Sequence, residues 1–154
     1  TGAESDRETA LRRVEEAVSS GRAAEKFDQM VAGLGGPTDF IDNYEKYLPV
    51  APIIQPVYPR SSGVLTQVDA IQVGNAIIEL GGGRRVLGEK LDLAVGFTDI
   101  AHIGDTVDNA RPLAIIHAAT DEQAQAAAEM VRGACEVSET GGKIEPVIHE
   151  IFRA

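Results

Sequence analysis

Residues 103–118, IGDTVDNARPLAIIHA, contain the pattern that decides the fold of this chain. Gly104, Asp105 and Asn109 are residues that turns favour, because they tolerate or stabilise tight backbone bends. The run from Leu113 to His117 is short and continuously apolar, which is typical of a buried strand. The stretch therefore predicts a turn followed by a buried strand.

A long helix is predicted directly after this strand, from about Asp121 to Val137. The residues on one of its sides are small or apolar at helical spacing, and they are Ala124, Ala127, Ala128, Val131 and Cys135. Upstream, the sequence predicts strands over 53–58, 63–68 and 94–97, the first of them an edge strand because of Pro56. A last strand is predicted over 146–152. The fold class is therefore mixed α/β (α+β).

The sequence also predicts helices before residue 49 and directly after the strand over 63–68. Asp69 is positioned to cap a helix that Gly81-Gly82-Gly83 ends. Before residue 49, the sequence predicts three short helices: one opened by a capping box at Ser5-Asp6-Arg7-Glu8, one over Phe27 to Leu34, and one capped by Thr38. Their apolar stripes are thin, so we expect these helices to lean on another surface. Residues 1–49 are predicted to form a helical segment, and residues 50–154 an α/β domain.

Composition restricts the possible partners and the compartment. The 154 residues contain 14 Lys and Arg against 24 Asp and Glu, a formal net charge of −10. Such a chain lacks the basic stripe that attracts nucleic acids and anionic membranes, so we expect neither partner. The single Cys135 excludes an internal disulfide and fits a reducing compartment, and no apolar stretch approaches the ~18 residues of a membrane span. A cytoplasmic location is predicted.

The segment GGGRR, from Gly81 to Arg85, invites comparison with phosphate-binding loops. Those loops place glycines before a helix, where N–H groups and the helix dipole favour anions, whereas these glycines follow one. The favoured interpretation is a helix stop at which Arg84 and Arg85 complement the negative end of the dipole. The alternative is a mobile basic loop that faces a cleft.

Other chemically interesting residues favour structural roles. His102, His117 and His149 are isolated from one another, so no metal site is predicted. The loop carboxylates of Asp92, Asp99, Asp105 and Asp108 lack the spacing of a calcium loop. Cys135 is predicted to be a core residue rather than a nucleophile, and no Ser-His-Asp grouping stands out. We therefore expect no self-sufficient catalytic site.

One scaffold pattern suggests an alternative function. Gly63-Val64, Ile103 to Val107 and Arg111 to Ala114 resemble the β-scaffold of biotinyl and lipoyl carrier domains. A carrier displays a lysine at a tight hairpin tip, and of the four lysines only Lys90 is a conceivable candidate. Its neighbours look like a connecting loop, which disfavours carrier function.

A family resemblance covers essentially the whole chain. Five stretches closely resemble the C-terminal part of bacterial thymidine phosphorylases, of the pyrimidine nucleoside phosphorylase family: GPTDF at 36–40, NYEKYLP at 43–49, GGGRR at 81–85, VGFTD at 95–99 and PLAIIHA at 112–118. The GGGRR and VGFTD sequences resemble thymidine phosphorylases more closely than they resemble the broader family.

The resemblance implies a reaction and an architecture. These enzymes are homodimeric pentosyltransferases that convert thymidine and phosphate, reversibly, into thymine and 2-deoxy-α-D-ribose 1-phosphate. They need no cofactor, since phosphate is a co-substrate. Their active site lies in a cleft between a helical and an α/β domain, and the enzyme closes over its substrates. Their C-terminal portion is a hammerhead-like barrel-sandwich lobe, which implies mixed or antiparallel strands and a long C-terminal helix here.

The family's phosphate-binding and base-binding motifs, which would choose between thymidine and uridine, match no position in this chain. We therefore assign no catalytic and no substrate-binding residue, and expect an inactive C-terminal fragment that supplies scaffold and cleft closure. Its first residue, Thr1, fits a processed end or a piece of a longer chain. Gly81 to Glu89, with Gly81, Gly82, Gly83, Arg84 and Arg85, is the predicted cleft-closing loop, in which the glycines permit motion. The alternatives are a carrier domain and a non-catalytic interaction module.

Overall fold

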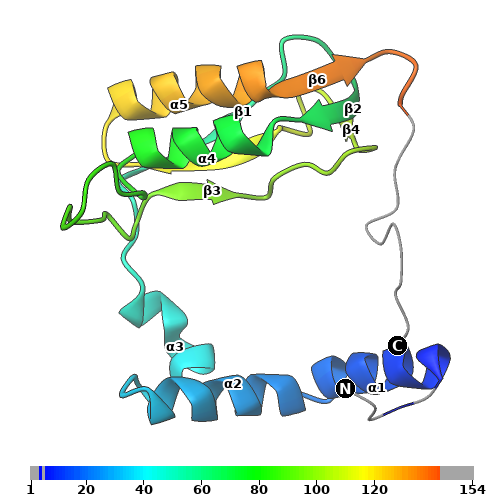
Figure 1. Cartoon of the computed structure of the whole chain (residues 1–154), viewed down its shortest axis with the longest axis vertical. Coiled ribbons are helices and arrows are strands. Elements are labelled where there is room, and N and C mark those ends of the chain that lie inside the picture. The colour runs from blue at the N-terminus through cyan, green and yellow to red at the C-terminus, as the bar shows by residue number, and fades with distance from the viewer. Residues whose placement is uncertain (1–3, 5, 143–154) are drawn as a thin grey trace. The chain divides into compact units, whose positions relative to one another are not determined.

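A computed structural model describes residue 4 and residues 6–142 of the chain (Figure 1). The chain divides into two compact units, residues 1–49 and residues 50–154. Each is described by itself below.

The first unit consists of three helices, α1 (Arg7–Ser19), α2 (Arg22–Gly33) and α3 (Phe40–Tyr47). Asp6 caps α1, because its carboxylate accepts hydrogen bonds from the backbone N–H groups of Glu8 and Thr9. The capping box predicted at Ser5 is thus wrong about the capping residue, and Ser5 itself lies outside the described residues. Asp39 stands at the N-terminus of α3 in place of the predicted Thr38.

Apolar contacts within this unit are few. Phe40 packs between Phe27 and Tyr47, with ring centroids 6.0 and 6.3 Å apart. The Asp28 carboxylate accepts a hydrogen bond from the Ile41 backbone N–H at 2.8 Å, which ties α2 to the start of α3. None of the described residues of the three helices is buried. Their exposed large apolar side chains include Leu11, Val14, Val18, Met30 and Leu34. The prediction of thin apolar stripes is confirmed.

Amide hydrogen exchange should separate the two units in dilute solution. We expect the amides of α1 and α2 to exchange much faster than those of Ala114–Ala118, because local opening of a helix costs little where no apolar side chain is buried. Equal protection of the helices and that strand in a monomeric sample would contradict the expectation.

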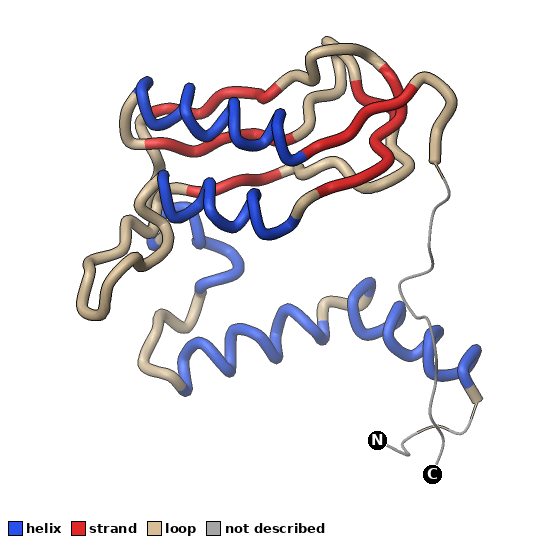
Figure 2. Tube along the Cα trace, turned by 45° about the horizontal axis from the view of Figure 1, so that its top comes forward, coloured by secondary structure: helices blue, strands red, loops and turns tan. Residues whose placement is uncertain are grey.

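The described residues of the second unit, 50–142, form two helices and two small antiparallel sheets (Figure 2). One sheet has the strand order β1-β5-β3, from Ile53–Val57, Ala114–Ala118 and Gly96–Thr98. The other has the order β4-β2-β6, from Thr106–Val107, Gly63–Val68 and Cys135–Ser138. The helices are α4 (Ala70–Glu79) and α5 (Asp121–Ala134). The α+β class is confirmed, and the strands of the described residues form no closed barrel.

The helix predicted over 121–137 is shorter than expected. It ends at Ala134, and Cys135 has extended backbone angles (φ −109°, ψ 128°) and begins β6 opposite Val68. Cys135 therefore belongs to a strand and not to the apolar side of the helix. The predicted turn after Gly104 also contains the short strand β4, which the sequence analysis missed. The strand predicted over 146–152 lies outside the described residues.

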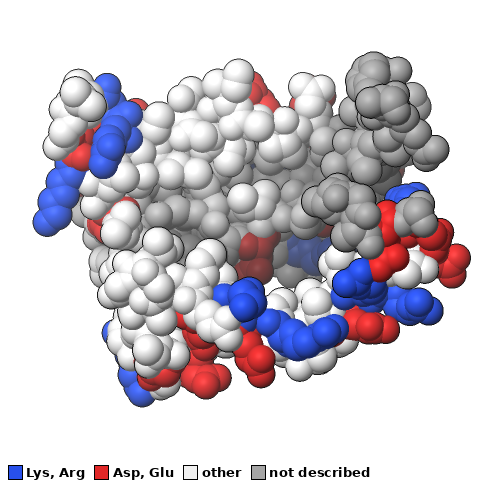
Figure 3. Space-filling model, turned by 60° about the horizontal axis from the view of Figure 1, so that its bottom comes forward, with Lys and Arg blue, Asp and Glu red and all other residues white. Residues whose placement is uncertain are grey.

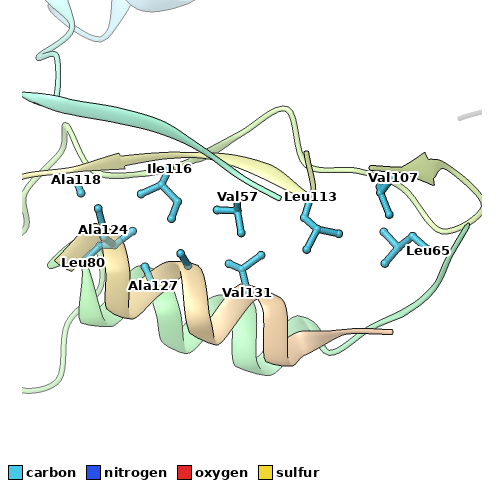
Figure 4. Close-up of a cluster of buried hydrophobic side chains, with 11 residues drawn as sticks. Val57, Leu65, Leu80, Val107, Leu113, Ile116, Ala118, Ala124, Ala127 and Val131 are labelled. Atoms are coloured by element: carbon cyan, nitrogen blue, oxygen red, sulfur yellow. The ribbon is translucent and has the colours of Figure 1, made fainter. Parts of the chain in front are cut away.

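The core lies between the helix pair and the strands. Figure 1 shows α4 and α5 side by side on one face of the strand layer, and Figure 4 shows the side chains that fill the space between them. Ala124 and Ala127 are fully buried and bring α5 close to the strands. The other core members are Val57, Leu65, Leu80, Val107, Leu113, Ile116, Ala118, Ala128 and Val131.

The turn that contains Gly104 and Asp105 is hydrogen-bonded to Leu65 on β2, in the second sheet. The backbone N–H of Gly104 donates to the Leu65 carbonyl at 2.8 Å, and the Leu65 N–H donates to the Asp105 carbonyl at 2.9 Å. Gly104 has a φ of +98°, which a residue without Cβ adopts at little cost. The predicted turn chemistry is confirmed.

Candidate functional site

The glycine run begins as the C-terminal cap of α4. Gly81 has a φ of +92°, and its N–H donates to the Ile78 carbonyl at 3.0 Å, while the Gly82 N–H donates to the Ile77 carbonyl at 3.0 Å. These two bonds form a Schellman motif, which satisfies carbonyls that the helix end would leave without partners. The predicted helix stop is confirmed.

Gly82 and Gly83 are needed for close packing against the same helix. A Cβ atom on Gly83 would lie 2.5 Å from Cγ1 and 3.3 Å from Cα of Ile78. A Cβ on Gly82 would lie 3.0 Å from Cγ2 of Ile77 and 3.3 Å from Cγ2 of Val95. The lack of side chains therefore lets the run pack closely against α4.

The segment from Gly81 to Asp92, called here the closing loop, is held by its own contacts. The Asp92 backbone N–H donates to the Gly81 carbonyl at 3.0 Å and closes the base of the loop. The Glu89 carboxylate accepts hydrogen bonds from the backbone N–H groups of Arg85 at 2.7 Å and Val86 at 3.4 Å. The Arg85 guanidinium forms an ion pair with Glu79 at 2.5 Å, which fastens the loop to the last turn of α4.

These contacts leave an apolar tip and two cations on the outside of the loop. Leu87 is 100% exposed and Val86 is 66% exposed. Arg84 and Lys90 are also exposed, and neither forms an ion pair within the part of the chain that the structure describes. The structure thus separates the two arginines that the sequence presented as a pair: Arg85 holds the loop, and Arg84 faces solvent.

The two hydrogen bonds from the backbone N–H groups of Arg85 and Val86 to the Glu89 carboxylate, called here the Glu89 clamp, should respond to pH. Hydrogen bonds from the backbone N–H groups of Arg85 and Val86 lower the pKa of Glu89 below its usual value. A lowered pKa means that the clamp is intact above the pKa of the unfolded carboxyl and is lost as pH falls through the folded one. We expect the amide resonances of Arg85 and Val86 to shift in NMR spectra over that acidic range. A Glu89→Gln variant should lack the transition, and an identical titration in that variant would rule out the clamp.

The remaining polar candidates do not form a catalytic group. The ring Nε2 of His117 lies 3.0 Å from the Thr98 hydroxyl oxygen, across neighbouring strands β5 and β3. His102 lies in an exposed turn, with Nδ1 3.7 Å from the Asp105 carboxylate. His149 lies outside the described residues. The two positioned histidines are therefore held apart in separate hydrogen-bonded settings.

An open cavity of about 320 Å³ lies beside the turn that begins at Gly104, and its lining includes Asp99, Asp105 and Arg111. The Asp105 carboxylate accepts a hydrogen bond from the His102 backbone N–H at 3.0 Å, the main cause of its lowered pKa, and Arg111 lies 3.9 Å away. Within the described residues, no cluster of three or more His, Cys, Asp or Glu side chains could hold a metal ion. The Asp105 carboxylate acts here as a turn-stabilising group.

The surroundings of Cys135 disfavour a nucleophilic thiolate, and those of Lys90 disfavour the displayed lysine of a carrier domain. Burial raises the pKa of the Cys135 thiol, which disfavours the nucleophilic thiolate. Lys90 lies in the connection from α4 to β3, which is not a hairpin between paired strands, since β3 pairs only with β5. The displayed hairpin lysine of a carrier domain is therefore absent from this position.

Fold and site together define the class: an α+β domain, two helices on two antiparallel sheets, that projects a self-supported basic loop from the end of α4. Residues 64–138, from β2 to β6, match the model of the pyrimidine nucleoside phosphorylase C-terminal domain. This match supports the resemblance to the C-terminal portion of a pyrimidine nucleoside phosphorylase that the sequence motifs predicted. No helix among the described residues is long and apolar enough to cross a membrane.

Proposed function

We propose that this chain is the C-terminal part of a thymidine phosphorylase. Such an enzyme reversibly converts thymidine and phosphate into thymine and 2-deoxy-α-D-ribose 1-phosphate. The observation that carries the proposal is the family match over 64–138, which contains both the GGGRR and the VGFTD stretches. The amino-acid sequences of these two stretches favour thymidine phosphorylases within the family.

The proposed contribution of the chain is scaffold and closure, with the groups that grip the substrates located elsewhere in the enzyme. Displacement at the anomeric carbon of a sugar requires aligned reactants and a cleft from which water is excluded. The His117 ring lies within hydrogen-bond distance of Thr98, and the Asp105 carboxylate is bound to the backbone of its own turn, which supports a structural role for both. Closure is the task that a stable domain with a projecting loop can perform.

The closing loop is the proposed point of contact with the cleft. Arg84 is free to meet an anionic group on the facing domain, whereas Arg85 shapes the loop through Glu79. Because the glycine run is packed on α4, the loop would move together with its domain as one body. In this proposal the loop acts as an arm of its domain, and motion within the glycine run stays a prediction.

The remaining properties are proposed on the same basis. The active enzyme would be a cytoplasmic homodimer that uses phosphate as a co-substrate and needs no metal or organic cofactor. Neither nucleic acid nor a membrane would be a partner, since the chain carries a net charge of −10.

Phosphorolysis assays test whether the catalytic groups lie outside this chain. The purified 154-residue chain should release no thymine from thymidine and phosphate, whereas a longer protein that includes it should do so. Thymine release can be followed by ultraviolet absorbance or chromatography. Robust turnover by the chain alone would show that it contains the catalytic groups and would refute the scaffold role.

Substitution of the two loop arginines tests the contact with the cleft. In the longer protein, Arg84→Ala should lower kcat/KM for thymidine about ten-fold, because a charge-assisted contact made in the closed state is lost. Arg85→Ala should also lower kcat/KM, through a loosened loop. Arg60→Ala is the matched control, since Arg60 is exposed and paired with Glu129 at 2.9 Å far along the chain from the loop. Unchanged kcat/KM in both loop variants would exclude this contact.

A further inference from the structure

We propose that the connection formed by residues 58–62, called here the strap, is a small gate over the cavity beside Cys135, and that the Arg132 side chain holds this gate closed. The gate opens by local movement of the strap while both sheets stay folded. This inference concerns the second unit alone and does not depend on the reaction proposed above.

The strap joins the two sheets and is anchored at both of its ends. It leads from β1 in one sheet to β2 in the other. Before the strap, the Leu113 backbone N–H donates to the Val57 carbonyl at 2.7 Å. After the strap, a Cβ atom on Gly63 would lie 2.7 Å from the Ser138 carbonyl oxygen, so β2 begins in close contact with β6. Movement is therefore confined to the residues between these two anchors.

Side chains, and not the backbone, hold the middle of the strap. Within the described part of the chain, no backbone–backbone hydrogen bond joins residues 58–62 to another segment. Instead, Nε of Arg132 on α5 donates to the Tyr58 carbonyl at 3.0 Å, and its Nη1 donates to the Glu129 carboxylate at 2.7 Å. Arg60 of the strap pairs with the same carboxylate at 2.9 Å. Both ties lead to α5.

The two ties differ in strength. The Arg60 and Glu129 side chains are 69% and 62% exposed, and ion pairs between exposed groups contribute little to stability. The Arg132 side chain is only 26% exposed, and its bond to the Tyr58 carbonyl is assisted by the guanidinium charge. Arg132 is therefore the tie that decides whether the strap stays in place.

Arg132 belongs to a part of the domain that does not move with the strap. Its neighbours on α5, Val131 and Ala134, are 3% and 4% exposed and belong to the buried core. Cys135 follows directly as the first residue of β6. The helix end and the thiol thus form one fixed frame, against which the strap opens and closes.

The strap forms part of the wall of the cavity beside Cys135. This cavity of about 140 Å³ is lined by residues of the strap, of α5 and β6, and of the core: Pro59, Arg60, Ser61, Arg132, Cys135, Val137 and Leu113. Cys135 is half-buried and packs against the core. Displacement of the strap would remove one side of the cavity and give reagents a wider path to the thiol.

A thiol behind such a gate reacts at a rate that follows the population of the open state. Local opening costs less free energy than global unfolding, so the chain can expose the thiol without losing its core. Cys135 is the single cysteine of the sequence, which makes its alkylation an unambiguous readout of the gate. The inferred function of the Arg132 tie is to limit the access of thiol reagents to Cys135.

Alkylation of the 154-residue chain by iodoacetamide at constant pH, followed by mass spectrometry, tests the tie. Arg132→Lys should raise the rate constant about ten-fold, because a compact ammonium does not reproduce the fork that reaches both Tyr58 and Glu129. Lysine keeps the positive charge near the thiol, so the faster reaction cannot be assigned to a lost cation. Arg132→Ala should react at least as fast as Arg132→Lys.

Arg85→Lys is the matched control. Arg85 also forms an ion pair beside a helix, with Glu79, but it does not line the cavity. Its replacement by lysine should leave the rate constant within about two-fold of that of the unmodified chain. An equal acceleration in Arg85→Lys and Arg132→Lys would overturn the proposal, because the effect would then not be specific to the strap.

Urea separates opening of the gate from global unfolding. Below the unfolding transition, the alkylation rate of Arg132→Lys should depend only weakly on urea, because movement of the strap exposes little surface. A urea dependence as steep as that of global unfolding, measured on the same variant by circular dichroism, would show that Cys135 reacts only from the unfolded chain. That result, or unchanged alkylation rates in both Arg132 variants, would refute the gate.

Discussion

The close approach of α5 to the strands is the constraint on which the rest of the second unit depends. Ala124 and Ala127 are fully buried, so the helix backbone lies near β1 and β5 and the larger side chains of the strands fill the remaining space (Figure 4). A bulkier residue at either position would have to displace a packed strand. This packing also fixes α4, which lies beside α5 and contributes Leu80 to the same core.

Leu80 connects the core to the closing loop. It is the C-terminal cap of α4 and still has helical backbone angles, its side chain is buried, and the next residue, Gly81, begins the loop. The side-chain amide of Gln123 on α5 donates to the Leu80 carbonyl at 3.5 Å, so both helices hold the point from which the loop departs. Figure 3 shows basic and acidic side chains interspersed on one face of the molecule, which gives that face no single sign of charge. The buried side chain of Leu80 and the hydrogen bonds of Gly81 and Gly82 set the point at which the loop leaves α4.

The sequence predicted those elements whose local signals agree with one another. The strand Gly63–Val68 was predicted with the bounds that the structure has, and the helix after Asp69 with its cap and its glycine stop, because β-rich residues, a capping aspartate and a glycine run follow in order. The helix α5 was predicted too long, because Cys135 fits its spacing although the backbone there pairs with Val68. The strand β4 was missed because two residues carry no periodicity, and only pairing with Gly63 and Val64 makes them a strand.

The same reasoning explains what sequence could and could not say about the candidate site. The position of Gly81-Gly82-Gly83 after a helix was enough to favour a helix stop over a phosphate cradle, and the Schellman motif agrees. The different duties of Arg84 and Arg85 were hidden, because they depend on which side chain reaches Glu79. The full exposure of Leu87 was not predicted, since a lone leucine in a polar segment has no signature. It goes with the turn in which the Glu89 N–H donates to the Val86 carbonyl. The base of the loop takes its position from α4, through the packing of its glycines and the hydrogen bond from Asp92 to Gly81, and such contacts between segments have no signature in the sequence.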